Sequence, residues 1–352
     1  MAVLNDLWRI NNPHYKLIPE LRSNLTAATP DDYYNLYSTH QINAVIVDDP
    51  DAPWYVRKAA QYDLAALNDL YDDDIVWERS TFANKYQGKG KGKRMMFHQN
   101  YLKMSNLAGV GSQLTGDCVS WAIRFVLELL RTQNIQHGEW EEFHRRQATA
   151  GIYSGRGHTG EGANPARLTA YACEIGTLFE EVYLDGKYDF TDYANYVRWG
   201  MSRGRSGMPD DLLELTKPYH AKTWKIITTV EGLMDAWAAG EDEGGCQIHC
   251  GSNIGVERRG SPISNLSGSW AHDMGMAGYD DTGDHFPLAV FAWDQSWGAW
   301  NNVTNIPKEW QPITQGMFFL GEASMPRALN AQGTCAFFGF EGKPAPPTNL
   351  LW

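Results

Sequence analysis

The feature that most constrains the fold is a helix that is apolar on nearly every side. Residues 119–131 read VSWAIRFVLELLR and directly follow Asp117 and Cys118. A helix with apolar residues all round its surface has to be buried inside a domain. Asp117 is a good N-cap residue, and the stretch before it, residues 109–116, is rich in glycine. The sequence therefore predicts a central helix that carries a single thiol at its N-terminus.

Composition limits the class of protein. The chain has 352 residues, of which 43% are hydrophobic and 20% charged, so it is long enough for one large domain or two ordinary ones. A formal net charge of −12 argues against nucleic acid as the main partner. We find no secretory signal at the start and no run of roughly 20 apolar residues that would predict a membrane span. We therefore expect a soluble protein made in a cytoplasm, and the five cysteines are too few for a disulfide scaffold.

The N-terminal part differs from the rest of the chain. Residues 53–71 combine helix formers with a three-to-four apolar spacing, which predicts a helix. Residues 86–94 alternate glycine and lysine, which favours a solvated linker over a patch that binds phosphate. We therefore divide the chain into an N-terminal extension of helix and loop, residues 1–95, and a main domain, residues 96–352.

Helices precede strands within the main domain. A helix is predicted over residues 166–175, after the N-cap residue Asn164 and Pro165. Short apolar or alternating runs predict strands of an antiparallel sheet at residues 224–229, 247–255, 274–279, 288–293 and 317–320, with a helix over 230–239 among them. The fold class is therefore α+β, with a helical half facing a sheet half and a cleft between them as the expected site.

Cys118 is the first candidate for chemistry. A thiol at a helix N-terminus lies at the positive end of the helix dipole and near free N–H groups, and both effects favour the thiolate. The alternative is a buried structural cysteine, which is the commonest role of an isolated thiol.

Two further segments could complete a site. His272 opens a run of small residues that ends at Gly278-Tyr279, and it could accept the thiol proton, although a strand-edge histidine is the alternative. Residues 291–298 read FAWDQSWG. In this run Asp294 or Gln295 could orient the imidazole, and Trp297 could shield that hydrogen bond from water.

Taken together and in this order, the three features resemble the papain-like cysteine peptidases. In that family the nucleophilic Cys begins a central buried helix after a Gln-containing loop, as Cys118 follows Gln113. The histidine opens a strand that ends in Gly-Tyr. The third residue lies in an Asn-Ser-Trp-Gly run, which is Gln295-Ser296-Trp297-Gly298 here. The glycine-rich segment at residues 155–176 occupies the place of the family's substrate loop, and the match covers residues 105–325.

The resemblance implies a papain-like fold and a role for each matching residue. Cys118 would be the nucleophile, His272 the base and Gln295 the residue that orients it. Gln113 and the Cys118 backbone N–H would form the oxyanion hole, with Asp117, Asp294, Ser296, Trp297 and Gly298 in support. The activity would be hydrolysis of peptide bonds in a protein or peptide substrate, with no cofactor and no metal.

The sequence departs from the family in ways that leave other readings open. Gln295 replaces the family's Asn, Gln113 lies five residues before the cysteine rather than six, and Val119 replaces an aromatic residue. The Gly-Asp-Cys-Val-Ser run is similar to papain-like proteins of bacteriophages. One alternative is therefore an inactive structural or docking protein of a phage particle, in which residues 1–95 contact other phage structural proteins.

Two more alternatives involve other chemistry. NlpC-type or CHAP-type cell-wall peptidases also have a Gly-Asp-Cys run, but their histidine lies much closer to the cysteine. Cys246, His249 and Cys250 are residue types that bind zinc. Side chains alternate along a strand, however, so His249 would face away from the two cysteines.

Overall fold

A computed structural model describes residues 75–105, 111–136, 145–257, 261–301, 303–329 and 333–341. The chain divides into two compact units, Met1–Asn68 and Asp69–Trp352, and all described residues belong to the second. The helix predicted over residues 53–71 lies outside the described residues.

In the second unit the elements follow one another as η2 Trp77–Arg79, α5 Thr81–Tyr86, β1 Arg94–Met96, α6 Phe97–Ser105, α7 Cys118–Gln136, β2 Gln147–Ala148, α8 Thr149–Tyr153, η3 Ser154–Arg156, α9 Pro165–Ile175, β3 Leu178–Phe179, β4 Val182–Tyr183, β5 Tyr188–Asp189, α10 Tyr193–Arg203, α11 Asp210–Thr216, β6 His220–Ile226, α12 Val230–Ala239, β7 Cys246–Val256, β8 Leu266–Asp280, β9 Val290–Asp294, η4 Lys308–Trp310, β10 Phe318–Gly321, η5 Glu322–Ser324, α13 Met325–Ala328 and β11 Thr334–Glu341.

A seven-stranded antiparallel sheet forms one half of this unit. Its strand order is β10-β9-β8-β7-β11-β6, and β1 also pairs with β8. β8 is the longest strand, and it pairs with β7 on one side and β9 on the other. It carries His272, so the histidine predicted to act as a base lies near the middle of the sheet.

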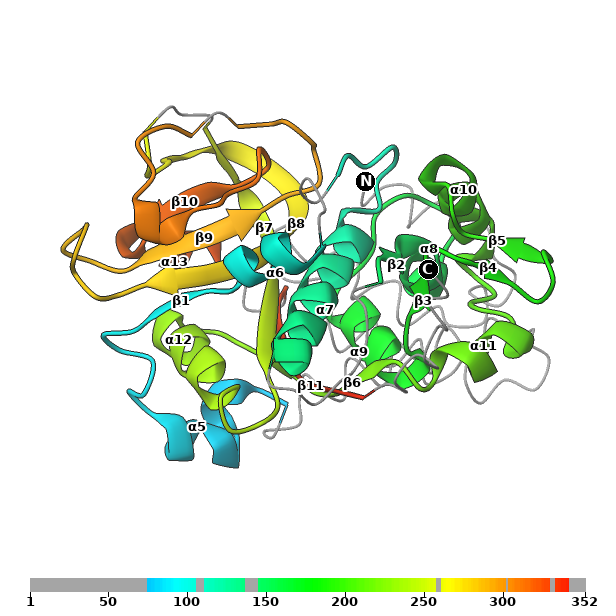
Figure 1. The fold of residues 1–352 in the computed structure, drawn as a ribbon, viewed down its shortest axis with the longest axis horizontal. Helices are drawn as coiled ribbons and strands as arrows, with labels where there is room; N and C mark the ends of the chain where they lie inside the picture. Colours follow the sequence, from blue (N-terminus) through cyan, green and yellow to red (C-terminus); the bar gives the residue numbers. More distant parts are fainter. Residues whose placement is uncertain are drawn as a thin grey trace, which may run out of the picture. The chain divides into compact units, whose positions relative to one another are not determined.

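The central helix α7 lies between the sheet and helices α8 and α9 (Figure 1). It packs against β7, β8 and β11 on one side and against α8 and α9 on the other. The close approach requires a glycine on the strand, because a Cβ at Gly275 would lie 2.2 Å from the ring of Phe125. Almost all of α7 is buried, as its apolar sequence predicts. The predicted α+β class, with a helical half packed on an antiparallel sheet half, is confirmed.

The opposite face of the sheet is covered by α12 and α13. Side chains of α12 join a hydrophobic core with Cys246, Ile248 and Cys250 of β7. Because these three residues alternate along β7, they share one face, and His249 points to the α7 and α9 side of the sheet. The predicted strand geometry of this segment is therefore confirmed.

Several elements agree closely with the sequence. The helix predicted over 230–239 is α12, and α9 begins after Asn164, whose side chain accepts a hydrogen bond from Arg167 N. β8 is longer than predicted, because it starts at Leu266 with polar and exposed residues. No sequence pattern predicted α10, α11 or β11.

The Gly-Lys segment is attached to the fold rather than solvated throughout. The Gly88 and Gly90 N–H groups donate to the two carboxylate oxygens of Asp235 at 2.8 and 2.9 Å. The Gly90 carbonyl accepts a 2.7 Å hydrogen bond from the Tyr279 hydroxyl, and Gly90 is buried against α12. These contacts differ from the predicted linker, because glycine allows a backbone to approach a helix more closely than any side chain would.

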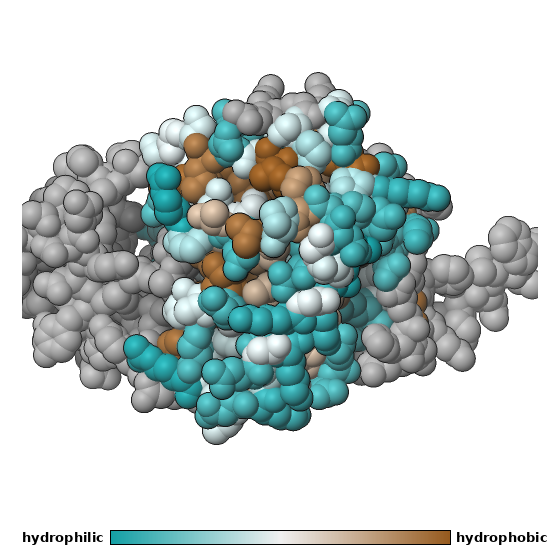
Figure 2. All heavy atoms as spheres, turned by 90° about the vertical axis from the view of Figure 1, so that its left-hand side faces the viewer, coloured by the Kyte–Doolittle hydropathy of each residue, from teal (hydrophilic) through white to brown (hydrophobic). Residues whose placement is uncertain are grey.

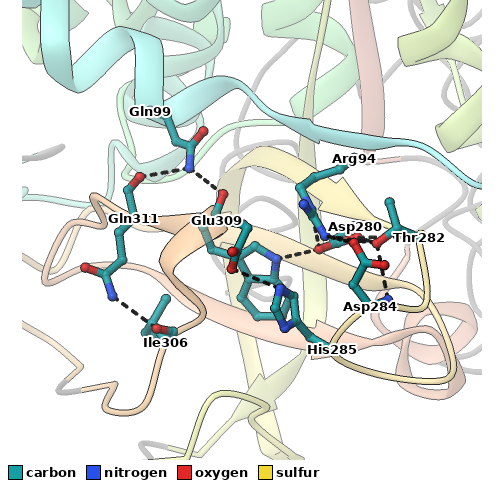
Figure 3. Close-up of polar contacts among 10 residues, drawn as sticks. Arg94, Gln99, Asp280, Thr282, Asp284, His285, Ile306, Glu309 and Gln311 are labelled. Atoms are coloured by element: carbon teal, nitrogen blue, oxygen red, sulfur yellow. Dashed lines mark hydrogen bonds and ion pairs between the residues drawn. The ribbon is translucent and has the colours of Figure 1, made fainter.

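The last residue of this segment, Arg94, is tied to the far end of β8 (Figure 3). The Arg94 guanidinium lies 2.7 Å from both the Asp280 and the Asp284 carboxylates, and His285 contacts Glu309 at 3.0 Å. The segment therefore belongs structurally with the sheet half.

One side of the sheet half carries hydrophobic side chains at its surface. They gather in the upper part of the face in Figure 2, while the lower part is hydrophilic. Leu288, between β8 and β9, is 56% exposed. Exposed apolar side chains are common on folded proteins and identify no partner by themselves. Among the described residues, no helix combines the length and apolarity needed to cross a membrane.

Candidate active site

The Cys118 thiol lies between the helix that it begins and the strand that carries His272. The Asp117 carbonyl accepts a hydrogen bond from Trp121 N at 3.1 Å, so α7 starts where the sequence predicts. The backbone N–H groups of Asp273 and Val119 lie near the thiol and act to lower the pKa of Cys118. Asp273 directly follows His272 in β8, so Cys118 lies near the strand segment that carries the predicted base.

Burial sets the resting charges of this pair. The pKa of Cys118 is raised to about 12, mainly by desolvation and in part by the nearby Asp273 and Asp117 carboxylates, although the two backbone N–H groups act in the opposite direction. Desolvation also lowers the pKa of His272 to about 4. The favourable effect of the helix N-terminus is therefore outweighed, and the resting pair is a neutral thiol and a neutral imidazole.

Tryptophans surround the His272 ring. Trp297 stacks on the imidazole, with ring centroids 4.1 Å apart and an interplanar angle of 18°. Trp270 meets the ring edge-on at 5.8 Å, and Trp270, Trp297 and Trp300 contact one another. Trp297 therefore covers one face of the imidazole, and this cover contributes to the burial that keeps the ring neutral. The sequence analysis singled out Trp297 but not Trp270 or Trp300.

Gln295, rather than Asp294, lies against the imidazole. The Gln295 side chain acts to raise the pKa of His272, against the larger effect of burial. The Nε2 atoms of His272 and Gln295 are both buried without a hydrogen-bond partner, and the Gln295 Oε1 accepts from Trp297 N at 3.0 Å.

Asp294 has a different set of partners. Its carboxylate accepts from the Thr314 hydroxyl at 2.9 Å and from Gln295 N at 2.8 Å, and burial raises its pKa to about 7. These contacts hold the loop after β9 in place.

The loop before Cys118 is fastened to the loop after β9. Gln113 N donates to the Ser296 carbonyl at 2.8 Å, and Gly298 N donates to the Gly111 carbonyl at 2.9 Å. Gly298 has a φ of 63°, which favours glycine there. The Ser296 hydroxyl donates to the Gln113 Oε1, and the Gln113 Nε2 donates to the Thr115 carbonyl at 2.9 Å. Gln113 is thus placed beside the site, but its donor is used within its own loop.

Asp117 turns away from the thiol into the helical half. Its carboxylate accepts the Tyr193 hydroxyl at 3.0 Å and the Thr149 hydroxyl at 3.3 Å, and burial raises its pKa to about 7. The Tyr193 hydroxyl also accepts from Leu114 N at 3.0 Å and from the Trp121 indole at 3.1 Å. Tyr193 thus links the loop to the first turn of α7, and no sequence signal pointed to it.

The glycine-rich loop expected to bind substrate lies next to the same segment. Gly162 N donates to the Gly116 carbonyl at 2.8 Å, and the Thr115 hydroxyl donates to the Glu161 carboxylate at 2.6 Å. The two segments quoted for the resemblance, before and after α7, are therefore neighbours in space.

No metal site is formed in the parts of the chain that the structure describes: no three His, Cys, Asp or Glu residues are arranged to hold an ion there. His249, considered with Cys246 and Cys250 as a zinc ligand, uses both ring nitrogens for contacts to Asp273 and Thr169.

Comparisons with known proteins give distant matches. The chain is similar in structure to xylellain, a cysteine protease from Xylella fastidiosa, with 14% identity, a TM-score of 0.43 and coverage of 66% of this chain and 82% of the other. It is also similar to SERA5E of Plasmodium falciparum, with 15% identity, a TM-score of 0.40 and coverage of 70% and 95%. The SERA5 proenzyme gives 12% identity, a TM-score of 0.40 and coverage of 96% and 89%. No family model and no curated protein matches the chain.

Proposed function

We propose that this chain is a cysteine peptidase in which Cys118 is the nucleophile and His272 the base. The observation that carries the proposal is the packing of α7, which begins at Cys118, on β8, in which Asp273 beside His272 acts on the thiol. The tryptophan stacked on the imidazole and the Gln295 amide against it give the ring a fixed place, as a general base requires.

The proposed reaction is acyl transfer followed by hydrolysis. The Cys118 sulfur attacks the peptide carbonyl while its proton passes to His272, and the imidazolium then protonates the departing amine. The resulting thioester is hydrolysed by water, which restores the thiol. Because the resting pair is neutral, proton transfer accompanies the attack. Gln113 would supply an oxyanion donor after releasing the Thr115 carbonyl.

A second candidate is an inactive papain-like protein that serves in docking. Two observations favour it: burial opposes charge on both Cys118 and His272, and the Gln113 donor is occupied. Whether such a protein belongs to a phage particle is part of the same hypothesis.

Alkylation distinguishes the two candidates. The folded chain is treated with iodoacetamide or an E-64-type epoxide from pH 4 to 9, and each labelled cysteine is identified by mass. The peptidase proposal predicts preferential labelling of Cys118 that slows at least ~10-fold in His272→Ala, because general-base assistance is worth about 100-fold or more. His285→Ala is the matched control, since His285 contacts Glu309 elsewhere. The proposal is refuted if Cys118 is labelled at the same rate in the wild type and in His272→Ala, and if that rate rises only as the pH approaches the ordinary thiol pKa.

A further inference from the structure

A buried arginine lies at the start of a surface loop in the helical half. Arg156 is the last residue of η3 and is only 1% exposed. The residues that follow it, 157–162, are half-buried or exposed throughout. Gly157 begins this loop with a φ of 80°, a conformation that favours glycine. The chain therefore passes from a buried cation to a surface loop within one residue.

The Arg156 guanidinium joins the loop to α8 and α10. Its Nε donates to the Gly160 carbonyl at 2.8 Å, and its Nη1 donates to the Tyr153 and Gly200 carbonyls at 2.8 and 2.9 Å. Its Nη2 donates to the Met201 carbonyl at 2.6 Å. Gly200 and Met201 lie in the last turn of α10, where the negative end of the helix dipole favours a cation. A planar guanidinium can bond carbonyls of several segments at once, so Arg156 fixes the loop to two helices.

The other side of the loop touches the segment before the nucleophile. Gly162 N donates to the Gly116 carbonyl at 2.8 Å, and Gly116 is two residues before Cys118. A Cβ at Gly116 would lie 2.9 Å from the Glu161 Cβ and 3.1 Å from Gly162 N, so the two segments meet without room for a side chain. Glycines in such a place allow another main chain to come close. The loop is therefore placed to contact a peptide that approaches the thiol.

Helix α10 connects the two sides of this arrangement. The hydroxyl of its first residue, Tyr193, donates to the Asp117 carboxylate at 3.0 Å, and its last turn accepts from Arg156. The loop also lies directly on the end of this helix, because a Cβ at Gly204 would lie 2.1 Å from the His158 carbonyl. One helix thus holds the nucleophile segment at its start and the loop at its end.

We propose that Arg156 is a positioning residue that sets the distance between the loop of residues 157–162 and Cys118, and with it the fit of a peptide main chain beside the thiol. The inference rests on the proposed function, since it assigns how a peptide is held at that nucleophile. Arg156 acts through the loop, because its four hydrogen-bond partners are main-chain carbonyls of the loop, α8 and α10.

The test compares two probes of Cys118 in full-length wild type and Arg156→Met. One probe is an E-64-type epoxide, which carries a peptide portion, and the other is epoxysuccinate, which has the same reactive ring without a peptide. Mass spectrometry gives each rate of Cys118 labelling, and the ratio of the two rates measures how well the peptide portion is held. In Arg156→Met this ratio is expected to fall ~10-fold or more, because a small misplacement of a binding element has effects of this size. The epoxysuccinate rate should stay within about 2-fold.

Arg131→Met is the matched control. Arg131 is also buried, and it donates to a main-chain carbonyl, that of Arg145, at 3.1 Å. It lies more than three turns after Cys118 in α7, roughly 20 Å along the helix axis. This variant is expected to lose stability in urea unfolding while the ratio of the two labelling rates stays at the wild-type value.

Three results would overturn the proposal. If Arg156 only stabilised the helical half, both rates would change together and the ratio would stay within about 2-fold of the wild type. A wild-type ratio near one would mean that the peptide portion finds no place beside the thiol. If Arg156→Met does not fold, Arg156→Lys keeps the charge without the planar fork; its ratio is expected to fall as well, and a wild-type ratio in that variant overturns the proposal.

The proposed function fails separately from this inference. If Cys118 is labelled by neither probe, or at a rate that does not depend on His272, the proposed function fails. If labelling depends on His272 but the ratio does not depend on Arg156, only the positioning role fails.

Discussion

The neutral state of His272 has a measurable effect on stability. Burial lowers its pKa from 6.5 to about 4, so the unfolded chain binds a proton in acid before the folded chain does. The stability associated with the neutral ring is present above pH 6.5 and is lost as the pH falls towards 4. At pH 4.5, two pH units below the unfolded pKa at 1.36 kcal/mol per unit, the loss is about 2.5 kcal/mol.

The perturbation is His272→Gln, which removes the titrating group but keeps a polar side chain. Urea unfolding followed by circular dichroism gives the free energy of unfolding at pH 7 and pH 4.5. The wild type is expected to lose about 2.5 kcal/mol more than the variant between these values. His285→Gln is the control, since it removes a histidine from the surface of the sheet half.

The neutral state of His272 is tested by comparing how much stability the wild type and His272→Gln lose in acid. Parallel losses in wild type and variant would mean that His272 titrates at its ordinary pKa. If the wild type instead loses less in acid than the variant, the folded pKa of His272 is raised, as in a thiolate–imidazolium pair. Either result would contradict a neutral resting state.

Two further predictions concern the segments that hold the site. Gly90→Ala is expected to cost about 1–3 kcal/mol of unfolding free energy, because the new Cβ would lie 2.4 Å from the backbone of α12. Gly160→Ala is the control, since a Cβ there would lie 3.5 Å from its nearest atom, and it should cost below about 1 kcal/mol in the same urea denaturation. Tyr193→Phe removes the hydroxyl that bonds Asp117 and Leu114 N, so we expect a loss of about 1–3 kcal/mol. In the wild type the Tyr193 hydrogen bond lowers the pKa of Asp117, so it stabilises the ionised carboxylate. The loss of unfolding free energy in Tyr193→Phe should therefore be larger at pH 8 than at pH 6. An equal loss at both pH values would contradict this hydrogen bond.

The sequence predicted the parts of the site that depend on local pattern. The apolar run after Cys118 requires burial whatever surrounds it, and Asn164 with Pro165 marks a helix start through contacts within one turn. Which partner each polar side chain selects depends on residues distant in the sequence. The Gln113 donor bonds its own loop, and Asp117 reaches Tyr193, so neither contact follows from spacing.

The elements that no sequence pattern predicted lack a clear alternation of apolar and polar residues. β11 is an example, because it is buried on both faces and therefore carries apolar residues on both. The Gly-Lys segment resembles a linker in composition because its contacts are made by backbone N–H groups and a carbonyl, which are the same for every residue type. The His249–Asp273 contact was also missed, because it joins adjacent strands through a diagonal register.

The position of β11 has a consequence for how the chain is made. This strand lies between β7 and β6, although it is the last of the sheet to be synthesised. While residues 334–341 are still inside the ribosome, β6 and β7 lack the neighbour that joins them, and each exposes an unpaired edge. The thiol of Cys118 and the imidazole of His272 emerge earlier, but the sheet behind them is completed last. A nascent chain therefore depends on protection of two open edges until translation has passed this strand.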